Sequence, residues 1–381
     1  MTDGRLHIAF ISDTFDSPTA GGVRSARRFV EGLRARHDVT VVAAGVSGDG
    51  ILELPAFYPP LVGKLMRRMG FVFAVPRRRP LEELFRRVDV VHVQFPFWLG
   101  LRAAAIANAL GTPLVSAFHV QPENLLRNLG LRAPRLAAPI YRLFLRYLFD
   151  RSDAVVCPSA FALAELRAHG LRAPAEVISN GVPPGLGPTF VERPARHRGK
   201  LLVVAAGRFA RDKRLDVTIE GVRRARNAAR IQLVITGRGP REREVRRRAA
   251  TLPVPAEVGF VSEAELRRLL AGADLLVHAS EVELESLAVL EALACGTPAL
   301  IARAPASAAP QFAVSEDFLF APGDPDDLAR RLDRLAEEPR LLSDARGLAL
   351  ALAGRHRFED SLRRLEALYL RVAGRRSVRS A

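Results

Sequence analysis

Residues 280–299 read SEVELESLAVLEALACGTPA, which places Glu283 eight residues before Glu291. An apolar run at 273–278 precedes this stretch, and a second run at 298–302 closes it. Each run is typical of a buried strand in a parallel sheet. The two glutamates therefore fall at a strand-to-helix junction, the position where open α/β sheets bind their ligands.

The segment between the two runs predicts a helix that begins near Ser286 and stops at Gly296, because a proline two residues later prevents continuation. Glu283 then lies in the loop before the helix, and Glu291 lies on its inward side. Both carboxylates can accept hydrogen bonds from hydroxyl groups. The alternative is a surface helix whose glutamates only face solvent, but the flanking strands and the Cys-Gly-Thr-Pro stop favour a binding site.

Strand-like and helix-like segments alternate along the rest of the chain, which predicts parallel sheets with helices on both faces. The strands of the first half are expected at 6–12, 38–43, 88–93, 113–118, 153–157 and 176–179, and those of the second half at 201–206, 231–236, 257–259, 273–278 and 298–302. A stretch rich in glycine and proline, 181–194, reads as a linker. The last apolar periodicity, at 358–372, predicts an amphipathic helix. A chain of 381 residues is long enough for two such domains.

Composition excludes several classes of protein. No run of eighteen uncharged apolar residues is present, so we expect no membrane-spanning segment. The first residues lack a signal-peptide arrangement, which favours the cytoplasm. Cys157 and Cys295 fall in unrelated segments and are expected to be small buried residues, and no His and Cys cluster suggests a metal.

The net charge is +16, and residues 60–150 alone hold 14 Arg or Lys against 5 Asp or Glu, a local excess that indicates a basic surface on the first half. Two segments, 61–79 and 135–149, combine arginines with large apolar side chains. Segments of this kind bind anionic membrane surfaces. The alternative is a pair of ordinary core-facing helices with arginine-rich outer faces. A nonenzymatic nucleic-acid-binding protein would also be basic, but no recognisable nucleic-acid motif accompanies the charge.

The segment 205–214, AAGRFARDKR, follows the first strand of the second half and carries one of only three lysines in the chain. Together with the Glu-x7-Glu spacing and the closing Gly-Thr-Pro, it resembles the retaining nucleotide-sugar glycosyltransferases of family four. The resemblance implies a GT-B fold, in which two Rossmann-like, doubly wound domains face a cleft and the last helix crosses back to the first domain. The expected boundaries are 1–185 for acceptor binding, 186–355 for the nucleotide sugar, and 356–381 for the crossover helix and basic tail.

The resemblance also implies a role for each site residue. Glu283 lies near the donor sugar, Glu291 holds the ribose, and Arg208 and Lys213 neutralise the departing diphosphate. His119, which ends a strand, lies beside the reacting sugar, although a histidine in that place is also a common structural residue. Further donor contacts are expected at Gly21, Gly22, Gly237, Gly239, Phe260, Val261, Ser286 and Leu287. His92, at the end of another strand, is interpreted as packing or acceptor-side support.

The reaction implied is a retaining hexosyl transfer that needs neither a metal nor a cofactor besides the nucleotide sugar. Short segments resemble bacterial diacylglycerol glucosyltransferases, which favours UDP-glucose as donor and a membrane lipid as acceptor at the inner face of the cell membrane. Phosphatidylinositol mannosyltransferases, which use GDP-mannose, share the same motifs. A soluble acceptor and a donor-hydrolysing or epimerising relative stay open. Leu284-Glu285-Ser286 stands where the family often has Gly-Phe-Gly, so the contacts to the sugar are expected to differ.

Overall fold

The computed structural model describes residues 4–17, 21–60, 63–131 and 134–379, with the side chains of 134 and 375–379 left aside. Positions 61–62 of the first basic segment and 380–381 of the basic tail lie outside the described residues. Two compact units make up the chain. The first unit contains Met1–Leu126, Arg132–Asn180 and Glu359–Ala381, and the second contains Arg127–Leu131 and Gly181–Phe358.

The first unit is built on a parallel sheet in the order β3-β2-β1-β6-β7-β8-β9. Its strands are β1 (His7–Ile11), β2 (Asp38–Ala44), β3 (Ile51–Leu54), β6 (Val90–Val93), β7 (Leu114–Ala117), β8 (Ala154–Cys157) and β9 (Ala175–Val177). Its helices are α1 (Gly21–Arg34), α2 (Gly63–Arg68), α3 (Arg78–Phe85), α4 (Trp98–Leu110), α6 (Ala137–Tyr147) and α7 (Ala160–Ala168), and α5 (Pro122–Asn128) belongs to it as far as Leu126. Three strands of this unit were missed by the sequence analysis: the edge strand β3, and β4 (Ala56–Phe57) and β5 (Phe73–Ala74), which form a short antiparallel pair.

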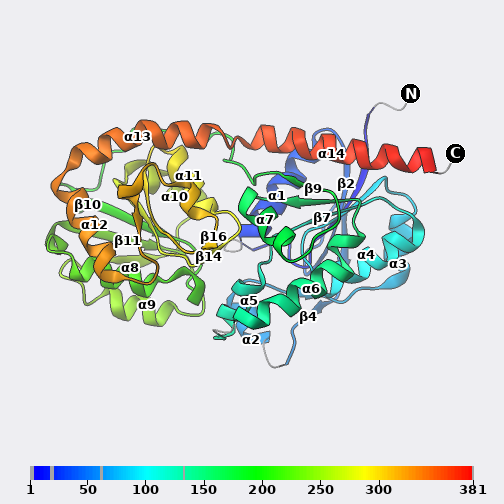
Figure 1. Cartoon of the computed structure of the whole chain (residues 1–381), viewed down its shortest axis with the longest axis horizontal. Coiled ribbons are helices and arrows are strands. Elements are labelled where there is room, and N and C mark those ends of the chain that lie inside the picture. The colour runs from blue at the N-terminus through cyan, green and yellow to red at the C-terminus, as the bar shows by residue number, and fades with distance from the viewer. Residues whose placement is uncertain (1–3, 18–20, 61–62, 132–133, 380–381) are drawn as a thin grey trace. The chain divides into compact units, whose positions relative to one another are not determined.

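The second unit repeats the design with a parallel sheet in the order β12-β11-β10-β13-β15-β17. Its strands are β10 (Leu201–Ala206), β11 (Ile231–Thr236), β12 (Glu257–Gly259), β13 (Leu275–His278), β15 (Ala299–Ala302) and β17 (Leu319–Phe320), with β14 (Val282–Glu283) and β16 (Ala306–Ser307) as a separate parallel pair. Its helices are α8 (Leu215–Arg224), α9 (Glu242–Ala249), α10 (Glu263–Gly272), α11 (Leu287–Ala294), α12 (Pro325–Glu337) and α13 (Pro339–Gly354). Helices cover both faces of each sheet (Figure 1), as the alternating pattern predicts.

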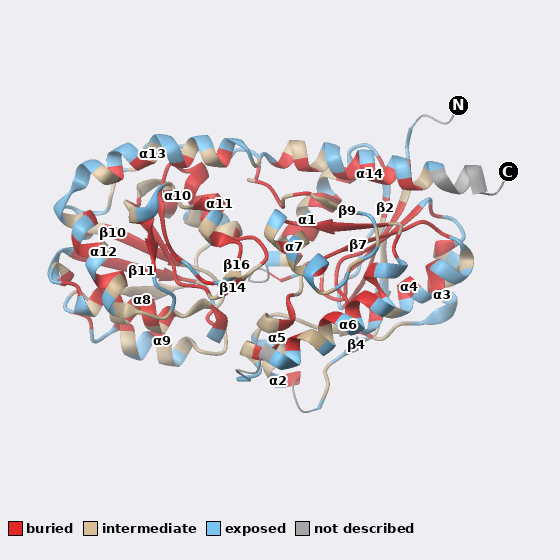
Figure 2. Cartoon of the chain, viewed as in Figure 1, coloured by how far each residue is buried: buried red, intermediate tan, exposed pale blue. Residues whose placement is uncertain are grey.

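The strand side chains alternate between two cores, which explains the continuous apolar runs in the sequence. In the second unit, Val203 and Leu233 pack on one face with α8, α9 and α12, whereas Leu202 and Val204 pack on the other face with α10, α11 and α13. The inner strands β11, β13 and β15 are consequently buried along their length, whereas the edge strand β12 is only partly buried (Figure 2). The sheet is thus a rigid platform whose strand ends carry the loops.

The last helix, α14 (Phe358–Arg379), belongs to the first unit from Glu359 onward. Glu366 lies 3.5 Å from His37 and accepts a hydrogen bond from Arg36 at 2.9 Å, and the Tyr369 side chain is fully buried. The chain therefore returns to its first unit after completing the second.

Candidate active site

The two segments singled out by the sequence analysis follow neighbouring strands of the second sheet. β10 pairs with β11 on one side and with β13 on the other, so the strand order reverses between β10 and β13. In doubly wound sheets, ligands bind beyond the carboxyl ends of the strands at such a reversal. The loop after β10 contains Arg208 and Lys213, and the loop after β13 contains Glu283. The topology alone therefore brings these residues to one edge.

Lys213 and Glu283 form an ion pair at this edge. His278 Nε2 lies 3.2 Å from the same Glu283 oxygen, and Lys213 Nζ lies 3.7 Å from the fully buried carboxylate of Asp212. Burial by itself would raise the pKa of Glu283, but Lys213 and His278 outweigh it and lower that pKa to about 2. Burial likewise opposes the charge on Lys213, yet Glu283 and Asp212 raise its pKa. Both groups are therefore ionised at neutral pH.

Arg208 adds a second cation beside this pair. Its Nη2 lies 3.8 Å from Asp212 Oδ1, and its side chain is 17% exposed. Its buried Nε has no hydrogen-bond partner within the part of the chain that the structure describes. A guanidinium held in this way can donate to phosphate oxygens.

The helix after the glutamate begins and ends nearly where the sequence predicts. Ser286 caps α11 by accepting a hydrogen bond from the Val289 amide, and its hydroxyl lies 3.3 Å from His278 Nε2. Leu287 is the first residue of α11, so the positive, N-terminal end of this helix lies at the same edge of the sheet. Glu291 is only 4% exposed, which confirms its inward position and rules out the solvated surface helix. Glu283 differs from expectation in one respect, since it pairs with Ser307 in the two-residue strand β14 rather than lying in a free loop.

Close packing explains why positions 237 and 239 are glycine, a reason that the sequence analysis did not foresee. A Cβ on Gly237 would lie 1.9 Å from the Gly207 carbonyl oxygen, and one on Gly239 would lie 2.5 Å from that of Phe209. Gly237 also has a φ of 149°, which disfavours other residues. The two glycines therefore let this loop pack directly against the segment that carries Arg208.

Phe260 and Val261 follow β12, next to the glycine loop. The Arg238 guanidinium stacks over the Phe260 ring at 4.2 Å from its centroid. Phe260 keeps 39% of its surface exposed. This pair offers a flat surface beside the strand ends.

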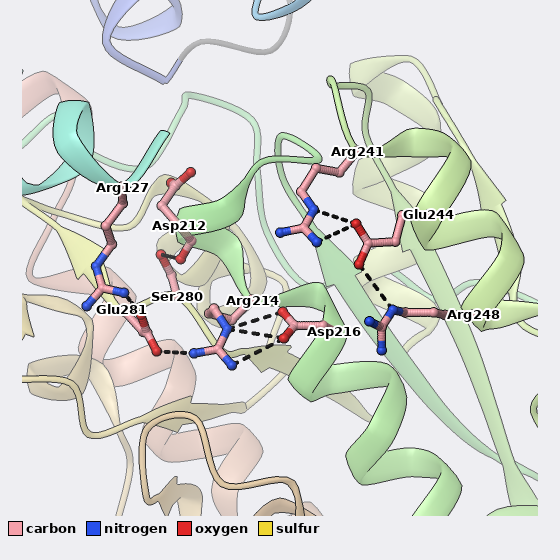
Figure 3. A network of polar contacts seen from close by, with 9 residues as sticks. All are labelled: Arg127, Asp212, Arg214, Asp216, Arg241, Glu244, Arg248, Ser280 and Glu281. Atoms are coloured by element: carbon pink, nitrogen blue, oxygen red, sulfur yellow. Dashed lines mark hydrogen bonds and ion pairs between the residues drawn. The ribbon is translucent and has the colours of Figure 1, made fainter. Parts of the chain in front are cut away.

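A polar network joins the two loops and contains residues that the sequence analysis missed (Figure 3). The Ser280 hydroxyl and the Glu281 amide both donate to the Asp212 carbonyl oxygen at 3.1 Å. The Glu281 carboxylate accepts hydrogen bonds from Arg214 and Arg127. The loops after β10 and β13 are consequently fixed to each other through backbone and side chains.

The remaining candidates, Gly21, Gly22 and His119, lie in the first unit. A Cβ on Gly22 would lie 3.1 Å from Phe95 Cε1 and 3.5 Å from His119 Cβ, so the start of α1 and the end of β7 are close neighbours. His119 is partly buried, and burial lowers the pKa of its imidazole to about 4. His119 is therefore a neutral hydrogen-bonding group at physiological pH.

Among the missed residues, His278 had a detectable sequence signal. It ends an apolar strand in the same way as His119, five positions before Glu283. Asp212 had none, because an aspartate in a basic loop reads as solvent-exposed.

Two family models match the chain. The model described as Glycosyltransferase Family 4 matches residues 19–186, and the model described as Glycosyl transferases group 1 matches residues 189–347. The chain belongs to the glycosyltransferases, with a Family 4 region followed by a group 1 region. The resemblance derived from residues 205–214 and 280–299 is thereby confirmed, and the enzyme is favoured over the nucleic-acid-binding alternative.

Two relatives of this glycosyltransferase have names that specify a lipid. A GDP-mannose-dependent alpha-(1-6)-phosphatidylinositol dimannoside mannosyltransferase of Mycobacterium tuberculosis is 29% identical over 352 residues, covering 85% of this chain and 86% of the relative. Alpha-monoglucosyldiacylglycerol synthase of Streptococcus pneumoniae is 25% identical over 235 residues, covering 56% of this chain and 52% of the relative.

Solved structures share the fold. HepE of Anabaena in complex with UDP and glucose matches with a TM-score of 0.75 at 16% identity, covering 96% of this chain and 99% of HepE. This glycosyltransferase thus has the GT-B fold that the sequence predicts. Across the described ranges, no group of three or more His, Cys, Asp or Glu side chains could hold a metal ion. Over the same residues, no helix has the length and apolar character needed to cross a membrane.

Proposed function

We propose that the second unit binds the diphosphate of a nucleotide sugar through Arg208 and Lys213, with Glu283 beside the sugar and Glu291 at the ribose. The observation that carries this proposal is the Lys213–Glu283 ion pair at the strand-order reversal, with Arg208 alongside. The cations and the nearby N-terminus of α11 supply the positive potential that a departing diphosphate needs.

The proposed reaction retains the configuration at the anomeric carbon. The bond from that carbon to the diphosphate oxygen breaks, and its electron pair leaves with the phosphate. The acceptor hydroxyl attacks the same face, and its proton passes to the departing phosphate oxygen. The low pKa of Glu283 suits a hydrogen-bond acceptor for a sugar hydroxyl and not a proton donor. Proton NMR of the product's anomeric signal tests retention.

We also propose that the transfer needs no metal. Arg208 and Lys213 place two cations where the diphosphate charge develops, and the resemblance to family four supports the same view. Assays of chelator-treated enzyme test this proposal. Turnover is expected to be unchanged by chelation, and a requirement for added Mg²⁺ or Mn²⁺ would refute it.

For the donor we place GDP-mannose ahead of UDP-glucose, the donor that the sequence analysis favoured. The mannosyltransferase relative matches a larger share of this chain than the glucosyltransferase relative, at higher identity. The nucleotide is expected to lie against the Arg238–Phe260 surface. Incubation with GDP-, UDP- and ADP-sugars, followed by measurement of released nucleotide, identifies the donor.

For the acceptor we propose a lipid at an anionic membrane surface. Both relatives reported above have names that specify a lipid. On α6, the side chains exposed to solvent include Arg142, Leu143, Arg146 and Tyr147. Such a mixed basic and apolar face suits the membrane interface. The other basic segment supports the proposal less, since Arg78 and Arg79 pair with glutamates of α3 at 2.6 and 3.0 Å. Liposome flotation at low salt tests the membrane step, and product formation in lipid-free assays would favour a soluble acceptor instead.

A further inference from the structure

A buried chain of hydrogen bonds in the first unit connects the last helix to the glycine turn at the start of α1. The Tyr369 hydroxyl lies 2.8 Å from His92 Nδ1, and His92 Nε2 lies 3.2 Å from Gln94 Oε1. The Gln94 amide nitrogen lies 2.9 Å from the carbonyl oxygen of Gly22. All three linking side chains are at most 2% exposed.

The direction of every hydrogen bond follows from the Gly22 end. A backbone carbonyl can only accept, so Gln94 must turn its amide nitrogen to Gly22 and its oxygen to His92. His92 Nε2 must then carry a proton in order to donate to that oxygen. A neutral imidazole has one N–H, so Nδ1 is an acceptor and the Tyr369 hydroxyl donates to it.

The position of His92 keeps the imidazole neutral and fixed. It lies on the central strand β6, where its ring stacks on Phe10 with centroids 4.4 Å apart and planes 13° apart. Gln94 is two residues further along, so both side chains leave the same face of the sheet. Burial lowers the pKa of His92 to about 3, and the neighbouring His119 adds to this effect.

The strand order puts this chain of hydrogen bonds where the first sheet reverses its strand order, the position at which doubly wound sheets bind ligands. β1 pairs with β2 on one side and β6 on the other, so the order reverses between β1 and β6, as it does at the site of the second unit. Gly22 follows β1 and lies against His119, which is the first unit's proposed contact to the sugar.

We propose that Tyr369, His92 and Gln94 are positioning residues that fix the Gly21–Gly22 turn, so that packing of α14 within the first unit sets the geometry of this turn. The inference rests on the proposed function in that the turn is taken to contact the donor. The relay touches no reacting atom. It acts by holding a backbone carbonyl.

Hydrogen–deuterium exchange tests the structural part without any substrate. Tyr369→Phe removes only the donor to His92, and Gln94→Glu keeps the side-chain size but replaces the group that donates to Gly22. Both variants are expected to raise amide exchange at residues 21–26 by about 3- to 10-fold, the effect of losing roughly one hydrogen bond. Arg371→Gln is the matched control, because it removes the α14 ion pair to Glu176 and leaves the relay intact.

Nitrogen-15 NMR of the histidines gives a signature that a purely packing role would not produce. His92 in the wild type is expected to show a single neutral tautomer protonated at Nε2, and Tyr369→Phe is expected to show a mixture. Unchanged exchange at 21–26 and an unchanged tautomer in Tyr369→Phe would overturn the inference. Equal loosening in Arg371→Gln would also overturn it, because general docking of α14 would then explain the effect.

Transfer assays then connect the relay to the reaction. Tyr369→Phe is expected to lower kcat/KM for the donor about 3- to 10-fold, whereas Arg371→Gln leaves it unchanged. Normal kcat/KM in a variant with loosened exchange would overturn the link to the site. Absence of transfer by the wild type with every donor would refute the proposed function. The exchange and NMR measurements would still show whether Tyr369, His92 and Gln94 hold the Gly21–Gly22 turn.

Discussion

Lys213 and Glu283, which are 70 positions apart in the chain, form an ion pair where the loops after β10 and β13 meet. His278 lies beside Glu283 and Asp212 lies beside Lys213, so each charge has two polar partners. Because both groups are mostly buried, removing one leaves the other without its main compensation.

Lys213→Ala is expected to lower kcat about 100- to 1,000-fold, the usual effect of removing one group that stabilises developing charge. The chain should still fold, since the sheet cores do not involve this side chain. Circular dichroism and single-turnover transfer assays measure the two effects. Lys200→Ala is the control, because this lysine precedes β10 at the opposite end of the strand. Near-normal turnover in Lys213→Ala would remove Lys213 from the mechanism.

Gly237→Ala is expected to destabilise the second unit by about 2 kcal/mol or more, since the new methyl group would meet the Gly207 carbonyl oxygen in a strained backbone conformation. Gly347→Ala on α13 is the matched control. Nothing lies within 4 Å of its Cβ position, and alanine there should stabilise the helix by roughly 0.5–1 kcal/mol. Urea denaturation measures both. Similar stabilities for the two variants would contradict the close packing of the glycine loop.

Stability is expected to fall on mild acidification because of two histidines in the first unit. The pKa values of His92 and His119 are lowered to about 3 and 4, so each contributes stability above pH 6.5 that is lost as the pH falls toward those values. Glu283 adds stability that is complete above about pH 4.5 and is lost progressively as the pH falls from there toward 2. Unfolding free energies measured from pH 7 to 4.5 should therefore decrease, and less steeply in His119→Gln. An identical slope in that variant would show that His119 is not buried as described.

Reversal of two charges on α6 is expected to weaken binding to anionic vesicles. Arg142→Glu with Arg146→Glu should lower the vesicle partition coefficient at least about 30-fold, since each basic residue near the surface contributes roughly 1 kcal/mol. Arg243→Glu with Arg247→Glu is a matched control, because these arginines are also exposed and four residues apart, on α9 of the second unit. Flotation at low salt measures the partition. Equal losses in the two double variants would indicate a nonspecific effect of net charge.

Local patterns predicted most of the fold. Buried parallel strands are continuous apolar runs, so β10, β11, β13 and β15 could be read directly from the sequence. The short strands β3, β4 and β5 could not, because segments of two to four residues are too short to show a periodicity of their own.

The candidate site was predicted only in part, for a similar reason. Lys213, Glu283 and Ser286 belong to local motifs, whereas His278 and Asp212 gain their importance from contacts that only the folded sheet creates. Gly237 shows the limit most clearly. A glycine turn indicates a close approach of the backbone, but the sequence does not reveal that the approaching group is Gly207.

Sugar transfer to a lipid tests the central claim most directly. The wild type and Lys213→Ala are incubated with labelled GDP-mannose or UDP-glucose and with vesicles that contain phosphatidylinositol and diacylglycerol. We expect the wild type to move labelled mannose from GDP-mannose into the lipid fraction and Lys213→Ala to lose nearly all of this product. Release of free sugar without a labelled lipid, or full product formation by Lys213→Ala, would contradict the account.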